Sequence, residues 1–454
     1  MHRPSVGIMI ALFTASTVDA QLLAWYSPAG AYPSACQTGL AVGDVDGDGD
    51  LDLWVADICA GSRLWLNDGT GTLTDSGQPL GGAGASDVAM GDLDGDGDID
   101  VYLAFDSLAF DSPNFSSPVW INDGNGVFSQ GGGSSPPNAS MAVELGDVDG
   151  DGDLDACLGM LGPNTIWLND GNGLFEDSLQ ELGEEWTWDT ALGDVDGDGD
   201  LDACFMNEAG VPNRIWLNDG AGTFSDSGRS FDADHARGVK LGDLDGDGHL
   251  DACVAHLKVN SVWLNDGTGE FTRSPGSLGN LTLTRDLALG DIDDDGDLDA
   301  WFANQGPDTV WHNEGDGTFV NRGQALGTGT SSSLVLGDLD GDGDGDAVVG
   351  DAHDQNAAII VWRRNEIDCP EDDGTAGDLD GDGDFDEEDV RLGMSQFGIT
   401  EGIPGDMDGD GDADRLDWEM LGEELGICLG DINGDGRVDA GDLGLVIGAW
   451  GLCP

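Results

Sequence analysis

The sequence contains very few basic residues. It has 15 lysines and arginines against 91 aspartates and glutamates, and its formal net charge at pH 7 is −76. A chain with this charge repels nucleic acids and anionic membranes, so neither is an expected partner. Such charge is typical of disordered chains, but 39% of the residues are hydrophobic and the 14 tryptophans recur at regular positions. The sequence therefore predicts a folded protein that its own charge repulsion makes fragile.

Long apolar runs are also lacking. One run, Val6–Phe13, follows His2 and Arg3 and precedes Ala20, and it is too short to span a membrane. A basic start, a short apolar core and a small residue before the cleavage point are typical of a secretory signal peptide, predicted here as residues 1–20. We therefore expect a secreted protein that lies outside the cell or at its surface, without a membrane span.

The side chains that usually perform catalysis are scarce. The chain has two lysines, three tyrosines and, after the predicted signal peptide, five scattered histidines. It contains neither a nucleophile-elbow motif nor a zinc-binding helix motif. The sequence therefore favours a binding function over an enzymatic one.

What the chain has in abundance is one acidic stretch, Gly43-Asp-Val-Asp-Gly-Asp-Gly-Asp-Leu-Asp52, which recurs seven times at steps of 48, 55, 47, 49, 48 and 47 residues. Carboxylates stand at positions 1, 3, 5 and 9 of each copy, with glycine at position 6. A glycine turn lets alternate aspartates converge on one point, which suits Ca²⁺, a hard cation that takes six to eight oxygen ligands. Position 7 adds a backbone carbonyl. The predicted ligand positions, loop by loop, are Asp44, Asp46, Asp48, Asp50 and Asp52; Asp92, Asp94, Asp96, Asp98 and Asp100; Asp147, Asp149, Asp151, Asp153 and Asp155; Asp194, Asp196, Asp198, Asp200 and Asp202; Asp243, Asp245, Asp247, His249 and Asp251; Asp291, Asp293, Asp295, Asp297 and Asp299; Asp338, Asp340, Asp342, Asp344 and Asp346.

The residues around these loops predict strands. Position 12 is apolar in all seven copies, as at Val55, whereas an EF-hand requires a carboxylate there. The positions two and four residues before each loop are nearly all apolar, as at Val42 and Leu40, and a period of two indicates a strand with one buried face. Each loop is therefore expected to join two strands.

A second signature follows each loop. It reads Trp65-Leu-Asn-Asp-Gly in the first unit and is repeated with small changes down to Trp362-Arg-Arg-Asn in the last. The Asn-Asp-Gly step is a strong hairpin signal, and a short strand usually follows it. Four strands in about 48 residues are the size of a propeller blade, so seven units predict a seven-bladed β-propeller. We expect Leu22–Tyr26 to complete the last blade.

The two signatures together resemble the FG-GAP/VCBS repeat, which is related to the integrin α-subunit propeller, over residues 21–366. The resemblance implies structural Ca²⁺ between two strands of each blade and ligand binding at the faces of the propeller. The departures are His249 at position 7, Asp294 at position 4 and Gly345 at position 8 of their loops. Some calcium-loaded propellers of related type are polysaccharide lyases. A polysaccharide-degrading enzyme, lyase or glycoside hydrolase, is therefore the alternative to a binding or adhesion module.

The character of the sequence changes near Cys369. Three further acidic loops carry aspartate at position 12 and are followed by apolar residues at helical spacing, so they resemble EF-hand loops of the dockerin type I module. The resemblance implies a small α-helical, calcium-binding module over residues 367–454 that binds a cohesin-like protein. Dockerins have two such loops rather than three, so a terminal anchor for a cell-surface protein is an equal alternative. The predicted ligand positions are Asp378, Asp380, Asp382, Asp384 and Asp389; Asp406, Asp408, Asp410, Asp412 and Asp417; Asp431, Asn433, Asp435, Arg437 and Asp442.

One face of the predicted propeller carries unrepeated residues. Most units have small side chains six to eight positions before the acidic loop, but units four to six carry Trp186, Trp188, His235, Arg237 and Arg285. Tryptophan beside arginine suits an anionic sugar of an extracellular polysaccharide, by stacking and by bidentate hydrogen bonding. The alternative is that the two arginines pair with the neighbouring Asp234 and Asp286 while the tryptophans fill a loop.

The eight cysteines fit an oxidising compartment only in part. Cys36 and Cys59 bracket the first propeller loop, and Cys428 and Cys453 bracket the last EF-hand-type loop, so each pair is a candidate disulfide. Cys157, Cys204 and Cys253 stand two residues after a ninth-position aspartate, where other units have an apolar residue. We interpret these three as small buried side chains.

Overall fold

The computed structural model describes one compact unit of the chain, Tyr26–Arg364. Within it the described residues are 26–33, 36–106, 118–132, 139–208, 210–232, 234–276, 278, 283–293, 295–321, 325–327, 329–351 and 358–364. The predicted signal peptide, the predicted EF-hand-type loops and the candidate Cys428–Cys453 pair lie outside these residues. No helix in the described part of the chain is long and apolar enough to cross a membrane.

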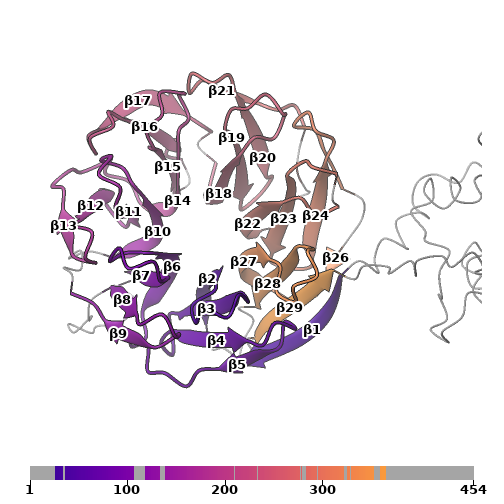
Figure 1. Ribbon diagram of the computed structural model, residues 1–454. Coiled ribbons are helices and arrows are strands. Elements are labelled where there is room, and N and C mark those ends of the chain that lie inside the picture. The colour runs from indigo at the N-terminus through magenta and orange to yellow at the C-terminus, as the bar shows by residue number, and fades with distance from the viewer. Residues whose placement is uncertain are drawn as a thin grey trace, which may run out of the picture. The chain divides into compact units, whose positions relative to one another are not determined.

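Seven antiparallel sheets surround a common axis, so the prediction of an all-β, seven-bladed propeller is confirmed (Figure 1). Blade one contains β2 (Gln37–Gly43), β3 (Asp52–Asp57), β4 (Arg63–Asn67) and β5 (Leu73–Asp75). Blade two contains β6 (Ala85–Gly91), β7 (Asp100–Phe105), β8 (Val119–Asn122) and β9 (Phe128–Gln130). Blade three contains β10 (Ser140–Gly146), β11 (Asp155–Met160), β12 (Thr165–Asn169) and β13 (Phe175–Asp177). Blade four contains β14 (Thr187–Gly193), β15 (Asp202–Asn207), β16 (Arg214–Asn218) and β17 (Phe224–Ser230).

The remaining blades follow the same order, with the first strand of each blade innermost (Figure 1). Blade five contains β18 (Ala236–Gly242), β19 (Asp251–His256), β20 (Ser261–Asn265) and β21 (Phe271–Arg273). Blade six contains β22 (Thr284–Gly290), β23 (Asp299–Asn304), β24 (Asp308–Asn313) and β25 (Phe319–Val320), and β26 (Ala325–Leu326) also pairs with β24. Blade seven contains β27 (Ser331–Gly337), β28 (Asp346–Asp351), β29 (Ala358–Arg364) and β1 (Tyr26–Pro33).

The second strand of each blade forms the core. In blade one, β3 is buried at all six positions, because its two faces pack against the neighbouring blades on either side. Trp54 packs with blade two, and Val55 packs with blade seven. The apolar residue at position 12 of each loop therefore lies in a core between blades, as the sequence predicts. The acidic loops join the first and second strands of each blade.

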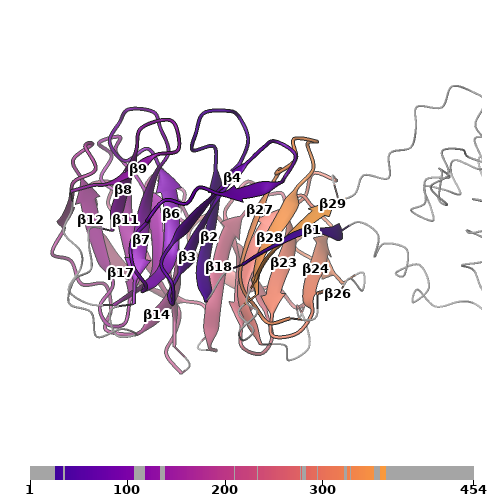
Figure 2. The same cartoon turned by 90° about the horizontal axis from the view of Figure 1, so that it is seen from below.

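The N-terminal strand closes the ring. β1 pairs antiparallel with β29, and the two strands run side by side in both views (Figure 1, Figure 2). The predicted closure by the N-terminal strand is confirmed: the described strand is Tyr26–Pro33, and Leu22–Trp25 of the predicted segment Leu22–Tyr26 lies outside the described residues. Proline is tolerated in an outermost strand, but it is rare in other strands. A sequence pattern that contains prolines therefore does not indicate a strand, although this segment forms one. Tyr32 anchors the strand, since its hydroxyl accepts a hydrogen bond from the Leu73 amide at 3.1 Å and its ring packs on Trp65.

Asparagine side chains link successive blades. The asparagine that ends the third strand of a blade donates one side-chain hydrogen bond to its own acidic loop and another to the loop of the preceding blade. In blade two, Asn122 Nδ2 reaches the Val45 carbonyl of blade one at 2.7 Å, and both groups are buried. The same bond, at 2.7–2.9 Å, recurs at Asn67, Asn169, Asn218, Asn265 and Asn313. Blade seven has Arg364 at this position.

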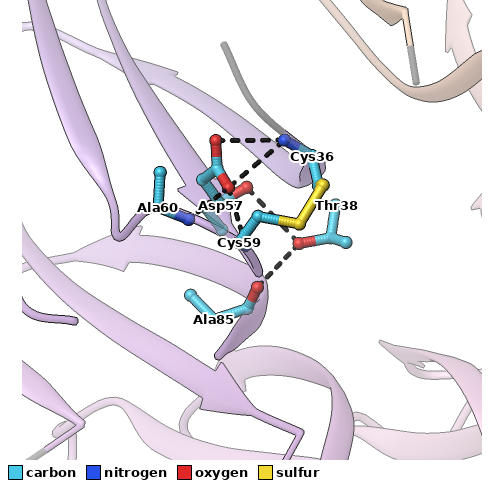
Figure 3. The surroundings of a disulfide bond; sticks show 7 residues. Cys36, Thr38, Asp57, Cys59, Ala60 and Ala85 are labelled. Atoms are coloured by element: carbon cyan, nitrogen blue, oxygen red, sulfur yellow. Dashed lines mark hydrogen bonds between the residues drawn. A yellow bond between two sulfur atoms is a disulfide. The ribbon is translucent and has the colours of Figure 1, made fainter. Parts of the chain in front are cut away.

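A disulfide fastens the start of blade one. Cys36 and Cys59 are bonded, as predicted, with their Cα atoms 5.5 Å apart (Figure 3). Asp57 lies beside the bridge and accepts hydrogen bonds from the amides of Cys36, Cys59 and Ala60. Cys157, Cys204 and Cys253 are free and buried, as predicted.

The first prediction concerns the link between blades. Asn122→Ala should lower the free energy of unfolding by about 1–3 kcal/mol, because it leaves the buried Val45 carbonyl without its donor. Asn125→Ala, in the exposed turn three residues later, is the matched control and should change stability by less than about 0.5 kcal/mol. Chemical denaturation in saturating Ca²⁺ measures both. Equal effects of the two substitutions would contradict the assignment.

Candidate metal loops and ligand face

The seven acidic loops share one turn. In loop one, Asp44 accepts hydrogen bonds from the amides of Gly47 at 2.8 Å and Gly49 at 3.0 Å. Both glycines have a positive φ, +76° and +98°, which other residues rarely adopt. The bond to the position-6 glycine recurs in the other loops at 3.0–3.1 Å. The turn gathers the aspartates at positions 1, 3, 5 and 9, as the sequence predicts.

The ninth-position aspartate is buried in every loop, and in loop seven Asp344 is buried as well. Asp52 is completely buried and accepts hydrogen bonds from the Val45 amide at 3.1 Å and the Asn67 amide at 2.8 Å. Burial raises the pKa of its carboxyl group to about 6, although the two hydrogen bonds lower it. A nearby cation would keep such a carboxylate ionised.

The carboxylates converge closely enough to hold a metal ion. In four of the loops, sets of three ligand oxygens lie within 4.8 Å of one another; the sets are Asp44, Asp46 and Asp48; Asp92, Asp94 and Asp96; Asp147, Asp149 and Asp155; Asp194, Asp196 and Asp202. These donors are all oxygens, which suit hard cations such as Ca²⁺. Position 7 points elsewhere. Its side chain lies against the glycine of the Asn-Asp-Gly turn, as Asp50 does at Gly69 and His249 at Gly267, so a histidine is tolerated there.

Loop six has a further group that the sequence analysis missed. His312 Nδ1 lies 2.9 Å from Asp293 and 3.5 Å from Asp299, and the three groups could share a metal ion. Burial lowers the pKa of His312, but its hydrogen bonds to the two aspartates outweigh burial and raise it to about 9. The sequence does mark this histidine, because unit six reads Trp311-His-Asn-Glu where most other units read Trp-Leu-Asn-Asp. Asp294, the other departure in this loop, lies outside the described residues.

At the opposite end of the inner strands, four of the five predicted ligand residues come together. The Arg237 guanidinium lies over the Trp188 ring, 3.6 Å from its centre, and the His235 ring centre is 6.3 Å from that of Trp188. Arg285 comes from the next blade and repels Arg237 electrostatically. With the Gln305 amide oriented so that its oxygen faces Arg285, that oxygen accepts hydrogen bonds from Nη2 at 2.8 Å and Nε at 3.3 Å.

The fifth predicted residue stands apart. The Trp186 side chain is 48% exposed, and within the described part of the chain it makes no ring contact with Trp188 or His235. Its carbonyl accepts a hydrogen bond from the Glu208 amide at 2.9 Å. The stacked cluster of Trp188, His235, Arg237 and Arg285, called the ligand face below, does not depend on it.

Several polar atoms of the ligand face lack a hydrogen-bond partner among the described residues. Trp188 Nε1, His235 Nε2 and Arg237 Nε are buried and have no hydrogen-bond partner among the described residues. Burial, and then repulsion by Arg285, lowers the pKa of Arg237 to about 10. Burial, followed by the charge of Arg237, also lowers the pKa of His235, which favours a neutral imidazole at pH 7.

The alternative in which the arginines pair with neighbouring acids is not what the structure shows. Among the described residues, neither Arg237 nor Arg285 forms an ion pair. Asp286 instead accepts hydrogen bonds from the amides of Leu287 and Leu334 at 2.8 Å each. The positive charge at this face is therefore not neutralised by a direct contact with those acids.

A second titratable cluster, also missed by the sequence analysis, lies on the inner strands around the ring axis. Asp87, Glu144, Asp189 and Asp286 interact electrostatically with Lys240. Burial is the main cause that raises the pKa of Asp87 to about 8 and that of Asp189 to about 7. Burial lowers the pKa of Lys240, but the surrounding carboxylates raise it more. A single lysine thus provides the positive charge that these four carboxylates interact with.

Comparison with known proteins identifies the repeats. The sequence model of the FG-GAP-like repeat matches residues 39–103, 194–254, 243–302 and 291–349. The chain therefore contains FG-GAP-like repeats on a seven-bladed β-propeller. A search of curated proteins finds no match.

Solved structures share the fold. A chain from crystals of BBS1N in complex with ARL6DN, soaked with lead or with mercury, matches at 12% identity with a TM-score of 0.52, and the match covers 76% of this chain and 98% of that one. An Agrocybe aegerita lectin that recognises non-reducing terminal N-acetylglucosamine matches at 19% identity with a TM-score of 0.43, over 63% of this chain and 79% of that one. At 12% identity the likeness to the BBS1N chain concerns the fold alone.

The axial cluster predicts a dependence of stability on pH. The folded protein holds protons on Asp87 and Asp189 that the unfolded chain releases near its ordinary pKa of about 3.9. The stability that these groups contribute is therefore fully present below about pH 4 and is lost between that pH and the folded-state pKa values of about 7 to 8. In saturating Ca²⁺, the free energy of unfolding should fall between pH 6 and pH 8, by up to about 1.4 kcal/mol per pH unit for each such proton, and level off above pH 8.

The substitution Asp87→Asn should reduce that fall, because the amide does not titrate and can still accept the hydrogen bond from the Val143 amide. Glu181→Gln, at an exposed position, is the control and should leave the pH profile unchanged. Chemical denaturation across the pH range measures all three proteins. A wild-type stability that is flat or rises over this range would contradict the assignment.

Proposed function

We propose that this FG-GAP-like repeat protein is a secreted, calcium-stabilised binding module that recognises anionic carbohydrate at the ligand face. The observation that carries the proposal is the stacking of Arg237 on Trp188 beside polar atoms that are buried without partners. Buried polar groups are normally hydrogen-bonded, so an assembled but unsatisfied set is typical of a binding site.

The charges at the ligand face favour an anion. Arg285 lies close enough to lower the pKa of Arg237, and the charge of Glu208 acts more weakly in the opposite direction, although acidic residues far outnumber basic ones in the chain. A bound carboxylate or sulfate would offset that repulsion and accept bidentate hydrogen bonds from the planar guanidinium groups. The Trp188 indole N–H would donate a hydrogen bond to a sugar hydroxyl, and neutral His235 would donate or accept one. A uronic-acid or sulfated polysaccharide combines these features.

The net charge of the chain limits how such a ligand binds. A charge of −76 repels a polyanion at long range. Salt screens this repulsion over about 10 Å at 0.1 M, while the contacts at the ligand face act at hydrogen-bond distance. Calcium ions in the acidic loops would reduce the repulsion further. We therefore expect binding to require Ca²⁺ and to survive moderate salt.

Calcium is the cation that fits the loops best. Each loop offers several carboxylate oxygens and a backbone carbonyl, a set that suits Ca²⁺ rather than softer metals. The Cys36–Cys59 disulfide supports an oxidising, extracellular location, where Ca²⁺ is available, and agrees with the predicted signal peptide. We propose that the EF-hand-type segment, residues 367–454, attaches the propeller to a cohesin-like or other cell-surface protein.

The calcium proposal predicts a large stability difference. Chelation with EDTA should lower the melting temperature, because each ion held at a concentration 100 times its dissociation constant contributes about 2.7 kcal/mol. Asp194→Asn should remove one bound ion, whereas Asp200→Asn, whose side chain lies against Gly220, should remove none. Calorimetry and counting of bound Ca²⁺ test both statements. A melting temperature that EDTA leaves unchanged would disprove a structural role for calcium.

The ligand proposal predicts that the propeller binds uronic-acid or sulfated polysaccharides in titration calorimetry. Arg237→Ala and Trp188→Ala should each weaken binding at least about tenfold, equivalent to about 1.4 kcal/mol. Arg214→Ala, which removes a surface arginine paired with Asp226, is the control and should bind as wild type does. The proposal fails if wild type binds none of these polymers or if both variants bind equally well. Release of reducing or unsaturated sugar in the same mixtures would favour the enzymatic alternative.

A further inference from the structure

The seventh acidic loop differs from the others in the two residues that follow the tryptophan of its blade. Blades one to five have leucine or isoleucine and then asparagine at these positions, as in Leu66 and Asn67. Blade seven has Arg363 and Arg364. The chain has only 15 basic residues, and two of them stand next to each other here.

The first of the two positions lies near the aspartate at position 3 of the loop. A Cβ atom added at Gly126, in the turn between β8 and β9 of blade two, would lie 3.1 Å from Asp46 Cβ and 3.6 Å from Leu66 Cδ2, so in blade one the leucine lies near this aspartate. In blade seven the equivalent side chain is charged. Arg363 Nη1 lies 3.5 Å from Asp340 Oδ2, at the third position of loop seven.

The second position brings another cation to the same loop. Arg364 Nη1 lies 3.5 Å from Asp344 Oδ1, at position 7, and the two side chains are only 11% and 8% exposed. The Arg364 amide still donates to Asp346 at 3.1 Å, as the asparagine amides of the other blades do to their ninth-position aspartates. Arg364 therefore keeps the backbone role of the asparagine and replaces its side-chain amide with a guanidinium group.

Loop seven nevertheless has the same backbone as the other loops. Gly341 and Gly343 have φ values of +75° and +98°, close to the +76° and +98° of loop one. Asp338 accepts hydrogen bonds from both glycine amides, at 2.8 and 3.1 Å. The two arginines thus contact a loop that has the same backbone conformation as the other acidic loops, and loop seven differs from those loops in the charged side chains beside it.

Arg363 also bridges two blades. Its Nη2 donates a hydrogen bond to the Thr70 carbonyl in the turn between β4 and β5 of blade one. A Cβ atom at the next residue, Gly71, would lie 2.6 Å from the same nitrogen, so only glycine leaves room for the contact. The guanidinium therefore joins the acidic loop of the last blade to the first blade, where the ring closes.

We infer that Arg363 and Arg364 supply in loop seven the positive charge that Ca²⁺ supplies in the other propeller loops, so that loop seven binds no calcium ion. Two guanidinium groups carry the charge of one Ca²⁺: Arg363 contacts Asp340, one of the carboxylates that converge in this loop, and Arg364 contacts Asp344 at position 7 of the same loop. The ring is then closed by covalently attached cations, whose charge does not depend on the calcium concentration. This inference rests on the proposal that the other loops bind calcium.

The test restores the residues of the other blades. The full-length double variant Arg363→Leu, Arg364→Asn should bind one more Ca²⁺ per chain than wild type, counted by elemental analysis after equilibrium dialysis against saturating free Ca²⁺. Arg363→Lys, which keeps a positive charge, and Arg63→Leu, which removes a surface arginine paired with Asp75 on blade one, should leave the count unchanged. An unchanged count in a double variant with wild-type circular dichroism would overturn the inference.

The reciprocal variant covers the case in which the double variant does not fold. Leu66→Arg places a guanidinium group beside Asp46 in loop one and should remove one bound ion, whereas Leu66→Met should remove none. Retention of every ion by a folded Leu66→Arg variant would count against the inference. A wild-type protein that binds no calcium at all would instead disprove the proposed role of calcium in every loop, which is a separate failure.

Discussion

Every blade depends on the buried carboxylate at the ninth position of its acidic loop. In blade one this group, Asp52, joins the loop to the third strand through the amides of Val45 and Asn67. The Asn67 side chain then reaches the preceding blade at the Leu339 carbonyl. One carboxylate and one asparagine thus fix the turn, the sheet and the contact between blades. Because a buried carboxylate is costly unless it is paired, the fold also requires positive charge nearby.

The chain meets that requirement with very few basic residues. Lys240 serves the carboxylates around the axis, and Arg363 and Arg364 serve the loop at the ring closure. Among the described residues the other propeller loops contact no comparable arginine pair, although Arg229 lies near Asp196 of loop four and His312 lies beside loop six, so a metal ion is their natural counter-charge. Against this background Arg237 and Arg285 are exceptional. They lie together, without a direct acidic contact, at the end of the strands opposite the acidic loops, so an external anion is the partner that their arrangement suits.

The local periodicity of the sequence predicted most of the fold, but it could not predict contacts between segments that are distant in the sequence. The loop spacing and the apolar residues around Val55 predict blades and strands because each pattern reports on its own segment. The links made by asparagines such as Asn122, and the cluster around Lys240, join residues from different blades and leave no local pattern. The extension of the closing strand to Pro33 was not predicted, because β1 contains prolines and lies at an edge. The cluster of Trp188, His235, Arg237 and Arg285 was singled out because its residues depart from the repeat, and His312 could have been found in the same way.

Departures from the repeat are also informative at the ring axis. At the position five residues before each acidic loop, Asp87, Asp189 and Asp286 alternate with small residues, and a Cβ atom at Gly39 would lie 2.6 Å from Asp87 Oδ1. An aspartate therefore needs a small residue at the same position in the preceding blade. Strict alternation cannot close in a ring of seven, so two small residues must meet once. They meet as Ser333 and Gly39, between blades seven and one, where the two ends of the propeller chain join and Arg363 makes the bridging contact.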